Sequence, residues 1–356
     1  MKRCAAKYSL DTSVMKSYMK PLLHNTWLKI IILICAVTSI SFSSTSSNKI
    51  EPIHLDDIHF IVTDEEEAVA FFTKHFGGRE MAHPGERFDL VRFISLKWQG
   101  PTITITPIGP YADLPPERNQ RWLDAEIIVP KSEKTKPVYG AKWLAISTSS
   151  LDKSRSELLA AGVEISENDV SLPLEPKTPA FSIYGPDGFE IIIVERPEYD
   201  FGDAKYAIDH IQFLVKDVHA TQEQVEKVFA AKQLESQPET VGLMVADAKL
   251  ILSEPKALGI NPKDVSSRLA KGTIRTGLDH LGFLYEDVKS AANEAEKNGY
   301  SPIFQPQKYI YKGKPTVYTF SAFKLPEDFN IEMVQADGRV GPHSYYMDQC
   351  NLKEKP

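Results

Sequence analysis

The amino-acid sequence predicts an α+β fold built from four βαβββ modules that form two cup-like domains. The main observation is an internal repeat within the 356 residues. Four segments begin alike, each with an alternating run of strand length that is rich in β-branched and aromatic residues. These openings are LDDIHFIVTD, AKWLAISTSSLD, IDHIQFLVKDV and LDHLGFLYEDV, which start at Leu55, Ala141, Ile208 and Leu278.

Each opening run is followed by a helical pattern that starts near an Asp or Ser, the residue types preferred at a helix N-cap. In the first module, Val69, Phe72 and Phe76 recur at helical spacing, and Gly77 and Gly78 end the pattern. Further strand candidates follow the helices, among them PTITITPI, FEIIIVE, AKLILSE and FNIEMVQ. The order of one strand, one helix and several strands is therefore repeated four times.

The interval of the repeat indicates one module per period. The aligned positions Asp57, Trp143, His210 and His280 are 86, 67 and 70 residues apart. A single module leaves a half-buried sheet, whereas two modules can close a cup with helices outside, a shape suited to a small ligand. The alternative is one irregular α+β fold with a coincidental period.

We expect consecutive modules to pair, so that each half of the chain forms one cup. The polar, turn-rich stretch Pro197–Lys205 (PEYDFGDAK) then separates an N-terminal domain, 50–198, from a C-terminal domain, 205–336. Residues 337–356 are expected to form a tail.

Residues 1–45 resemble a secretory signal with its flank. Lys16, Lys20 and Lys29 precede the apolar run Ile30–Phe42, and the small polar stretch SSTSSN follows it. The run has 13 residues, fewer than the roughly 20 that a membrane-spanning helix needs. We therefore expect export to the periplasm or the medium; the alternative is a membrane anchor formed by residues 28–42.

Charge favours a small-molecule partner over nucleic acid. The net charge is −7, and residues 1–45 hold six Lys or Arg and one Asp, so the remainder is near −12. Phosphate binding needs a basic surface, and an acidic body lacks one. We expect no nucleic-acid partner, and no membrane contact beyond the signal segment.

Cysteine usage excludes two kinds of site. The chain has only Cys4, Cys35 and Cys350, and the first two fall in the signal segment. One remaining thiol can form neither an internal disulfide nor a cysteine zinc site.

The LDH-type openings and the closing hairpins GPDGFEIIIVE and LPEDFNIEMVQ resemble the vicinal-oxygen-chelate superfamily, which includes glyoxalases, bleomycin resistance proteins and extradiol dioxygenases. The resemblance covers about residues 51–336. It implies two tandem domains of paired modules, with a metal in a cup held by first-strand and last-strand residues. The expected cofactor is a divalent metal, Fe(II), with Mn, Zn and Ni as alternatives.

Carried over to this sequence, the resemblance implies three metal ligands in the C-terminal domain. His210 and His280 hold the first-strand positions, and Glu332 holds the last-strand position of the fourth module. Strand alternation predicts that His280 faces the cup while Asp279 faces away.

The matching positions of the N-terminal domain imply a degenerate site. They are occupied by Asp57, Trp143 and Ile192, of which the last two cannot bind a metal. His59 shares a strand face with Asp57, and this pair is either a relic or second weak site or a solvated, hydrogen-bonded pair.

Two imidazoles and one carboxylate form the facial triad of non-haem Fe(II) oxygenases, which leaves positions open for substrate and O₂. We therefore expect a dioxygenase-like enzyme acting on a small oxygenated organic substrate. One alternative is a glyoxalase-type lyase or isomerase, which in this superfamily typically uses four protein ligands. The other is a non-catalytic small-molecule-binding protein. Ala322 stands where aromatic-ring extradiol enzymes carry a Tyr, which argues against standard catechol cleavage.

Overall fold

The computed structural model describes residues 51–81, 92–97, 100–108, 126–129, 137–267, 273–310, 317–327 and 329–336. All of them belong to one compact unit, Ile50–Pro356. The expected signal segment, its anchor alternative, Cys350 and the tail lie outside the described residues. Within those ranges, no helix is long and apolar enough to cross a membrane.

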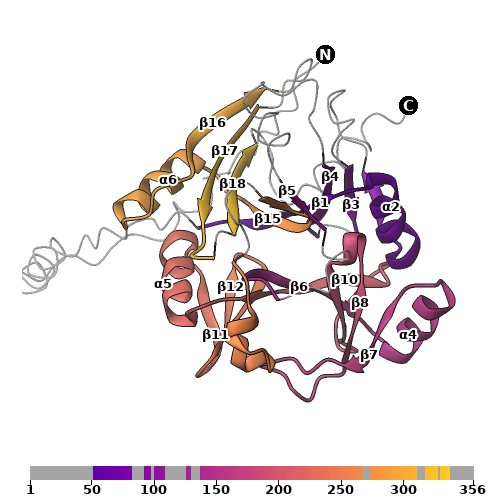
Figure 1. Ribbon diagram of the computed structural model, residues 1–356. Coiled ribbons are helices and arrows are strands. Elements are labelled where there is room, and N and C mark those ends of the chain that lie inside the picture. Colours follow the sequence, from indigo (N-terminus) through magenta and orange to yellow (C-terminus); the bar gives the residue numbers. More distant parts are fainter. Residues whose placement is uncertain are drawn as a thin grey trace, which may run out of the picture. The chain divides into compact units, whose positions relative to one another are not determined.

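Two eight-stranded sheets, here called sheet 1 and sheet 2, form the body of the protein (Figure 1). Sheet 1 has the strand order β16-β17-β18-β15-β1-β4-β3-β2, and sheet 2 has the order β11-β12-β13-β10-β6-β9-β8-β7. The strands of sheet 1 are β1 (His54–Val62), β2 (Arg79–Met81), β3 (Arg92–Ser95), β4 (Thr102–Pro107), β15 (Gly277–Leu284), β16 (Phe304–Ile310), β17 (Val317–Lys324) and β18 (Asn330–Ala336). The strands of sheet 2 are β6 (Gly140–Thr148), β7 (Ile165–Asp169), β8 (Ala180–Tyr184), β9 (Glu190–Glu195), β10 (Tyr206–Leu214), β11 (Lys232–Gln237), β12 (Thr240–Val245) and β13 (Ala248–Ser253). A small parallel pair joins β5 (Glu126–Ile128) to β14 (Thr273–Arg275).

The predicted fold class with two cups is confirmed, but the modules pair differently from our expectation. Sheet 1 joins the first module to the fourth through the antiparallel pair β1 and β15. Sheet 2 joins the second to the third through β6 and β10. The expected pairing of the first module with the second, and of the third with the fourth, is wrong, because each range, 50–198 and 205–336, holds one module of each sheet. All four openings share one alternating pattern, which shows that a module needs a partner but not which one.

Four helices follow the four opening strands, as predicted. They are α2 (Glu65–Ala70), α4 (Leu151–Ala160), α5 (Val218–Phe229) and α6 (Val288–Lys297). The π-helical turn η1 (Phe71–His75) continues α2. Three of the four begin at an Asp whose carboxylate accepts a backbone N–H of the first turn, as an N-cap does. These caps are Asp64, Asp217 and Asp287.

The first module meets the second, and the third meets the fourth, through a carboxylate in a turn. Asp187, in the 3₁₀ turn η3 (Pro186–Gly188), accepts the backbone N–H of Thr63 at 2.7 Å. Glu327, at the equivalent turn of the fourth module, accepts the N–H of Lys216 at 3.0 Å. Two further 3₁₀ turns are η4 (Pro255–Leu258) and η5 (Pro262–Asp264). These two contacts therefore join modules that lie in different sheets, whereas modules that share a sheet pair through strands.

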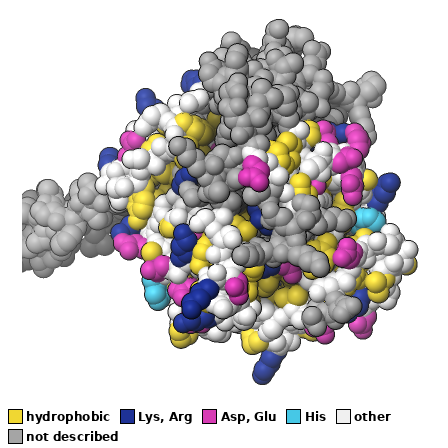
Figure 2. Space-filling view, viewed as in Figure 1, with side chains coloured by type: hydrophobic (Ala, Val, Ile, Leu, Met, Phe, Trp, Pro, Cys, Tyr) yellow, Lys and Arg dark blue, Asp and Glu magenta, His cyan; other side chains and the backbone are white. Residues whose placement is uncertain are grey.

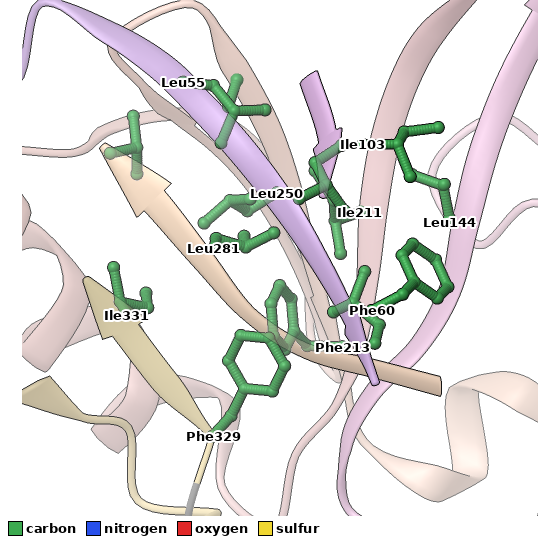
Figure 3. Close-up of a cluster of buried hydrophobic side chains, with 14 of the residues drawn as sticks. Leu55, Phe60, Ile103, Leu144, Ile211, Phe213, Leu250, Leu281, Phe329 and Ile331 are labelled. Atoms are coloured by element: carbon green, nitrogen blue, oxygen red, sulfur yellow. The ribbon is translucent and has the colours of Figure 1, made fainter. Parts of the chain in front are cut away.

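One cluster of buried hydrophobic side chains joins the two sheets (Figure 3). Its members include Leu55, Phe60, Ile103, Leu281 and Ile331 of sheet 1, and Leu144, Ile211, Phe213 and Leu250 of sheet 2. Aromatic pairs connect the sheets, since the ring centroids of Phe213 and Phe329 lie 4.8 Å apart with the rings edge to face. One face of each sheet is thus committed to this shared core.

Charged side chains of both signs are interspersed on the described part of the face in Figure 2. Surface ion pairs include Arg155 with Asp169 and Lys205 with Glu157. Exposed pairs of this kind contribute only about 0–1 kcal/mol each to stability. The shared core, rather than the surface charge, therefore holds the sheets together.

A buried ion pair connects the two modules of sheet 2. Arg196, which follows β9, donates from Nε to Oδ2 of Asp209 at 2.7 Å and from a terminal nitrogen to Oδ1 at 3.1 Å. Both side chains are buried. Burial alone would raise the pKa of the Asp209 carboxyl, but hydrogen bonds from His210 and Arg196 hold it well below its usual range. Asp209 is therefore ionised in the folded protein.

Fragments 50–198 and 205–336 should each fail to fold cooperatively when produced alone. Each contains one module of each sheet and leaves the opening strands without their partners. Thermal unfolding followed by circular dichroism tests this, and mixing the two fragments should restore a cooperative transition. A sharp transition in either isolated fragment would contradict the observed pairing of modules.

Asp209→Asn should lower the free energy of unfolding by about 3–5 kcal/mol, because it removes the buried carboxylate that pairs with Arg196 and His210 and leaves Arg196 with Glu175 alone. The folded pKa of Asp209 is depressed, so its contribution is fully present above the unfolded value of about 3.9 and falls as the pH drops below it. Denaturant unfolding should show a constant difference from wild type above about pH 5 and a smaller one below about pH 4. A difference that grows in acid would rule out this role for the ionised carboxylate.

Candidate metal centre

The structure separates the three ligands that we predicted. His280 lies on β15 and Glu332 on β18, which are neighbours in sheet 1. His210 lies on β10 in sheet 2, where its Cα pairs with that of Ala145. The structure therefore does not bring His210 to the other two predicted ligands, because the third module, which carries His210, and the fourth module lie in different sheets.

The structure instead brings His280 and Glu332 next to two residues of β1. Nδ1 of His59 lies 3.0 Å from Nε2 of His280. One donor atom each from Asp57, His59 and His280 lies within 4.8 Å of the other two. Oε2 of Glu332 is 3.7 Å from Nε2 of His280. All four side chains are half-buried, so a cup with two imidazoles and two carboxylates remains reachable from solvent.

Strand register explains why these side chains converge. The antiparallel pairing places His59 opposite His280 and Asp57 opposite Gly282. The parallel pairing of β15 with β18 places Gly282 beside Glu332. A Cβ atom at Gly282 would lie 2.0 Å from Oδ1 of Asp57. Only glycine at this position leaves the Asp57 carboxylate room beside the imidazoles.

A β-bulge lies next to the ligand position in every opening strand. In each strand the register skips the residue that precedes the aligned position. The skipped residues are Asp56, Lys142, Asp209 and Asp279. The bulge lets Oδ2 of Asp279 lie 2.8 Å from Nδ1 of His280. Asp279 therefore contacts the imidazole of the next residue, a contact that simple strand alternation does not predict.

Burial and neighbouring charges shift the ionisation of the group. Burial raises the pKa of the Asp57 carboxyl to about 7, against the effect of the His280 charge. Burial also lowers the pKa of His59 to about 3, and the charge of His280 adds to that shift. For His280, burial acts downward, but the hydrogen bond to Asp279 and the charge of Glu332 outweigh it and raise the pKa to about 9. At neutral pH the group therefore holds positive charge on His280, between the carboxylates.

The hydrogen bonds are consistent with this charge distribution. With His280 protonated, its Nε2–H donates to Nδ1 of His59, and Nε2–H of His59 donates to Oγ1 of Thr106 at 2.6 Å. The protonated imidazole of His280 thus lies where the four donor side chains meet.

The donor set suits a divalent transition metal. Imidazole nitrogens together with carboxylate oxygens bind Fe, Mn, Zn and Ni, whereas Mg and Ca prefer all-oxygen sites. Space for the carboxylate at Gly282 and the spacing of the three donors fit such an ion. Asp57, His59 and His280 would hold it directly, and Glu332 is placed to become a fourth ligand.

Sheet 2 has the same strand register but lacks these donor side chains. At the positions equivalent to Asp57, Thr104 and Glu332 it carries three hydrophobic residues. These are Trp143, Ile192 and Ile251. His210 is fully buried there, with Nδ1 2.6 Å from Oδ1 of Asp209 and no described hydrogen-bond partner for Nε2. Trp143 and Ile192 do lie at a degenerate site, but His210 lies there as well.

Asp57 and His59 belong to the candidate centre, although the sequence predicted only a relic or second weak site, or a solvated, hydrogen-bonded pair. Their shared strand face was visible in the sequence, but they lie more than 200 residues from His280. Only the knowledge that the first module pairs with the fourth would have placed Asp57 and His59 beside His280. Residues two positions apart on β1 then face both the imidazole and the carboxylate of the last module.

Comparison with known proteins identifies the fold. No protein-family profile and no curated protein matches the sequence. Among solved structures, glyoxalase I from Zea mays is 15% identical with a TM-score of 0.55, over 85% of this chain and 97% of that one. A putative dioxygenase from Bacillus subtilis is 14% identical with a TM-score of 0.56, over 86% and 91% of the two chains. Together with the four modules and the two sheets, these similarities show that the chain has the fold of the vicinal-oxygen-chelate superfamily.

Proposed function

We propose that this protein is a divalent-metal-dependent enzyme whose active site is the cup of sheet 1. The observation that carries the proposal is the convergence of Asp57, His59 and His280, with donor atoms within 4.8 Å of one another. Three such donors on rigid strands hold an ion in a fixed geometry. The remaining coordination positions stay open for a substrate.

The leading reaction class is dioxygenase-like, with Fe(II) as the metal. Two imidazoles and one carboxylate form the ligand set of non-haem Fe(II) oxygenases, and Asp57 and His59 supply here what we had expected from His210 and Glu332. A bound Fe(II) supplies Lewis-acid polarisation of chelated substrate oxygens and a site for O₂. The work of the protein is to fix the three donors on paired strands and to orient the substrate.

The wall beside the donors supports an oxygenated substrate. Thr102, Thr104 and Thr106 alternate along β4, and the first two pair with Asp57 and His59 respectively. In sheet 2 the positions equivalent to Thr104 and Thr106 are Ile192 and Val194. These threonines give the cup a polar wall beside the donors, whereas sheet 2 has an aliphatic wall at the equivalent positions.

A glyoxalase-type lyase or isomerase is the second candidate, and Glu332 is the observation that favours it. Its carboxylate lies 3.7 Å from Nε2 of His280 but outside the group of three mutually close donors. A carboxylate beside a metal-bound substrate can remove a proton alpha to a carbonyl. The same cup therefore holds a base that the dioxygenase reaction does not require.

Purified protein should bind about one equivalent of divalent metal per chain, and His280→Ala should weaken that binding more than about 100-fold. The matched control is His210→Ala, which removes the equivalent imidazole in sheet 2 and should leave metal affinity unchanged. Elemental analysis and isothermal titration with Fe(II), kept anaerobic, measure both. Metal loss in the His210 variant together with metal retention in the His280 variant would refute the proposed centre. Absence of tight metal binding to wild type would favour a non-catalytic binding protein.

The reaction class can be decided with Fe(II)-loaded protein and a panel of vicinal diols and α-hydroxyketones. Oxygen uptake that matches substrate loss, and that persists in Glu332→Gln, would establish the dioxygenase class. Anaerobic deuterium uptake alpha to a carbonyl, reduced about 10²–10⁴-fold in Glu332→Gln, would establish proton transfer with Glu332 as base. We expect the first outcome.

A further inference from the structure

A second layer of side chains determines how the two imidazoles face each other. Oδ2 of Asp279 lies 2.8 Å from Nδ1 of His280, and Oγ1 of Thr106 lies 2.6 Å from Nε2 of His59. The two remaining ring nitrogens, Nε2 of His280 and Nδ1 of His59, are 3.0 Å apart. The rings therefore meet through chemically different nitrogens.

We infer that Asp279 and Thr106 are positioning residues that hold His280 and His59 in opposite tautomers. A divalent cation would then be bound by Nε2 of His280 and by Nδ1 of His59. This inference rests on the metal centre proposed above. It adds which nitrogen of each ring binds the cation and which side chains decide that.

The chemistry of the two outer contacts supports the assignment. A metal ligand must present a bare nitrogen, so the proton of each neutral ring has to lie on the other nitrogen. An ionised carboxylate only accepts, so Asp279 keeps a proton on Nδ1 of His280. The Thr106 hydroxyl can accept from Nε2–H of His59, which leaves Nδ1 of that ring as a lone pair.

Strand geometry, rather than loop conformation, creates both contacts. The bulge at Asp279 brings its carboxylate to the ring of the next residue. Thr104 pairs with His59 in the parallel register, and Thr106 lies two residues farther along the same face of β4. Side chains fixed by paired strands hold a ligand more accurately than side chains on loops.

Sheet 2 keeps one half of this arrangement and loses the other. The bulge and the contact between Asp209 and His210 recur at 2.6 Å. Ala145 and Val194, however, stand at the positions equivalent to His59 and Thr106. An Asp–His contact next to a bulge can therefore be purely structural, and only the experiment below distinguishes a positioning role in sheet 1.

The first test is Co²⁺ affinity, measured by titration of the full chain without substrate. Thr106→Val and Asp279→Asn should each weaken Co²⁺ binding about 10–100-fold, and each should change the visible Co²⁺ spectrum. Thr106→Ser keeps the hydroxyl and should retain wild-type affinity. Wild-type affinity and spectrum in both Thr106→Val and Asp279→Asn would overturn the inference.

Matched controls make the same chemical changes away from the imidazoles of sheet 1. Thr102→Val alters the same face of β4, but the Thr102 hydroxyl donates to the backbone oxygen of Asp56 at 3.3 Å. Asp209→Asn repeats the bulge substitution in sheet 2; if it does not fold, His210→Gln takes its place. These controls should keep wild-type Co²⁺ affinity, and an equal loss in them would show that the effect is only structural.

The second test is the tautomer of His59, read from ¹⁵N chemical shifts of the metal-free protein. We expect Nε2–H in wild type and in Thr102→Val, and a population of Nδ1–H in Thr106→Val. Nδ1–H in wild type would overturn the inference even if Co²⁺ binds. A wild-type chain that shows Nε2–H but binds no Co²⁺ would instead overturn the proposed metal centre.

Discussion

The antiparallel pairing of β1 with β15 is the constraint on which the rest of the structure depends. It joins the first module to the last and so closes the chain upon itself, with the second and third modules paired between them. It also places His59 opposite His280 and Asp57 opposite Gly282. A shift of one residue in this register would turn every donor to the opposite face. The pairing that closes the fold is therefore also the pairing that assembles the candidate metal centre.

The two cups show how one architecture divides its tasks. In sheet 1 the face away from the shared core carries carboxylates, imidazoles and threonines, whereas sheet 2 buries Trp143, Ile192 and Val194 at equivalent positions. Each fully buried hydrophobic side chain of this kind stabilises the fold by about 1.5–3 kcal/mol. Sheet 2 thus adds stability to a unit in which sheet 1 keeps half-buried charged groups.

The bulges connect local backbone geometry to chemistry. Each opening strand carries one at the residue before its aligned ligand position. In sheet 1 the bulge brings Asp279 to the outer nitrogen of His280. In sheet 2 the same feature brings Asp209 to His210, where Arg196 neutralises the carboxylate. One repeated backbone irregularity therefore places a carboxylate beside an imidazole in both cups, and in sheet 2 that carboxylate also pairs with Arg196.

The sequence by itself determined the four modules, their helices and caps, and two of the residues at the centre, His280 and Glu332. Those features follow from the spacing of hydrophobic residues and from contacts between residues close in the chain, both of which can be read from the sequence. Only the tertiary structure decided which modules pair, and hence that Asp57 and His59, rather than His210, lie beside His280. The four openings are too alike to specify their partners, since each offers the same alternating face to any other. Partner choice depends on contacts between residues far apart in the chain, such as those that pair β1 with β15.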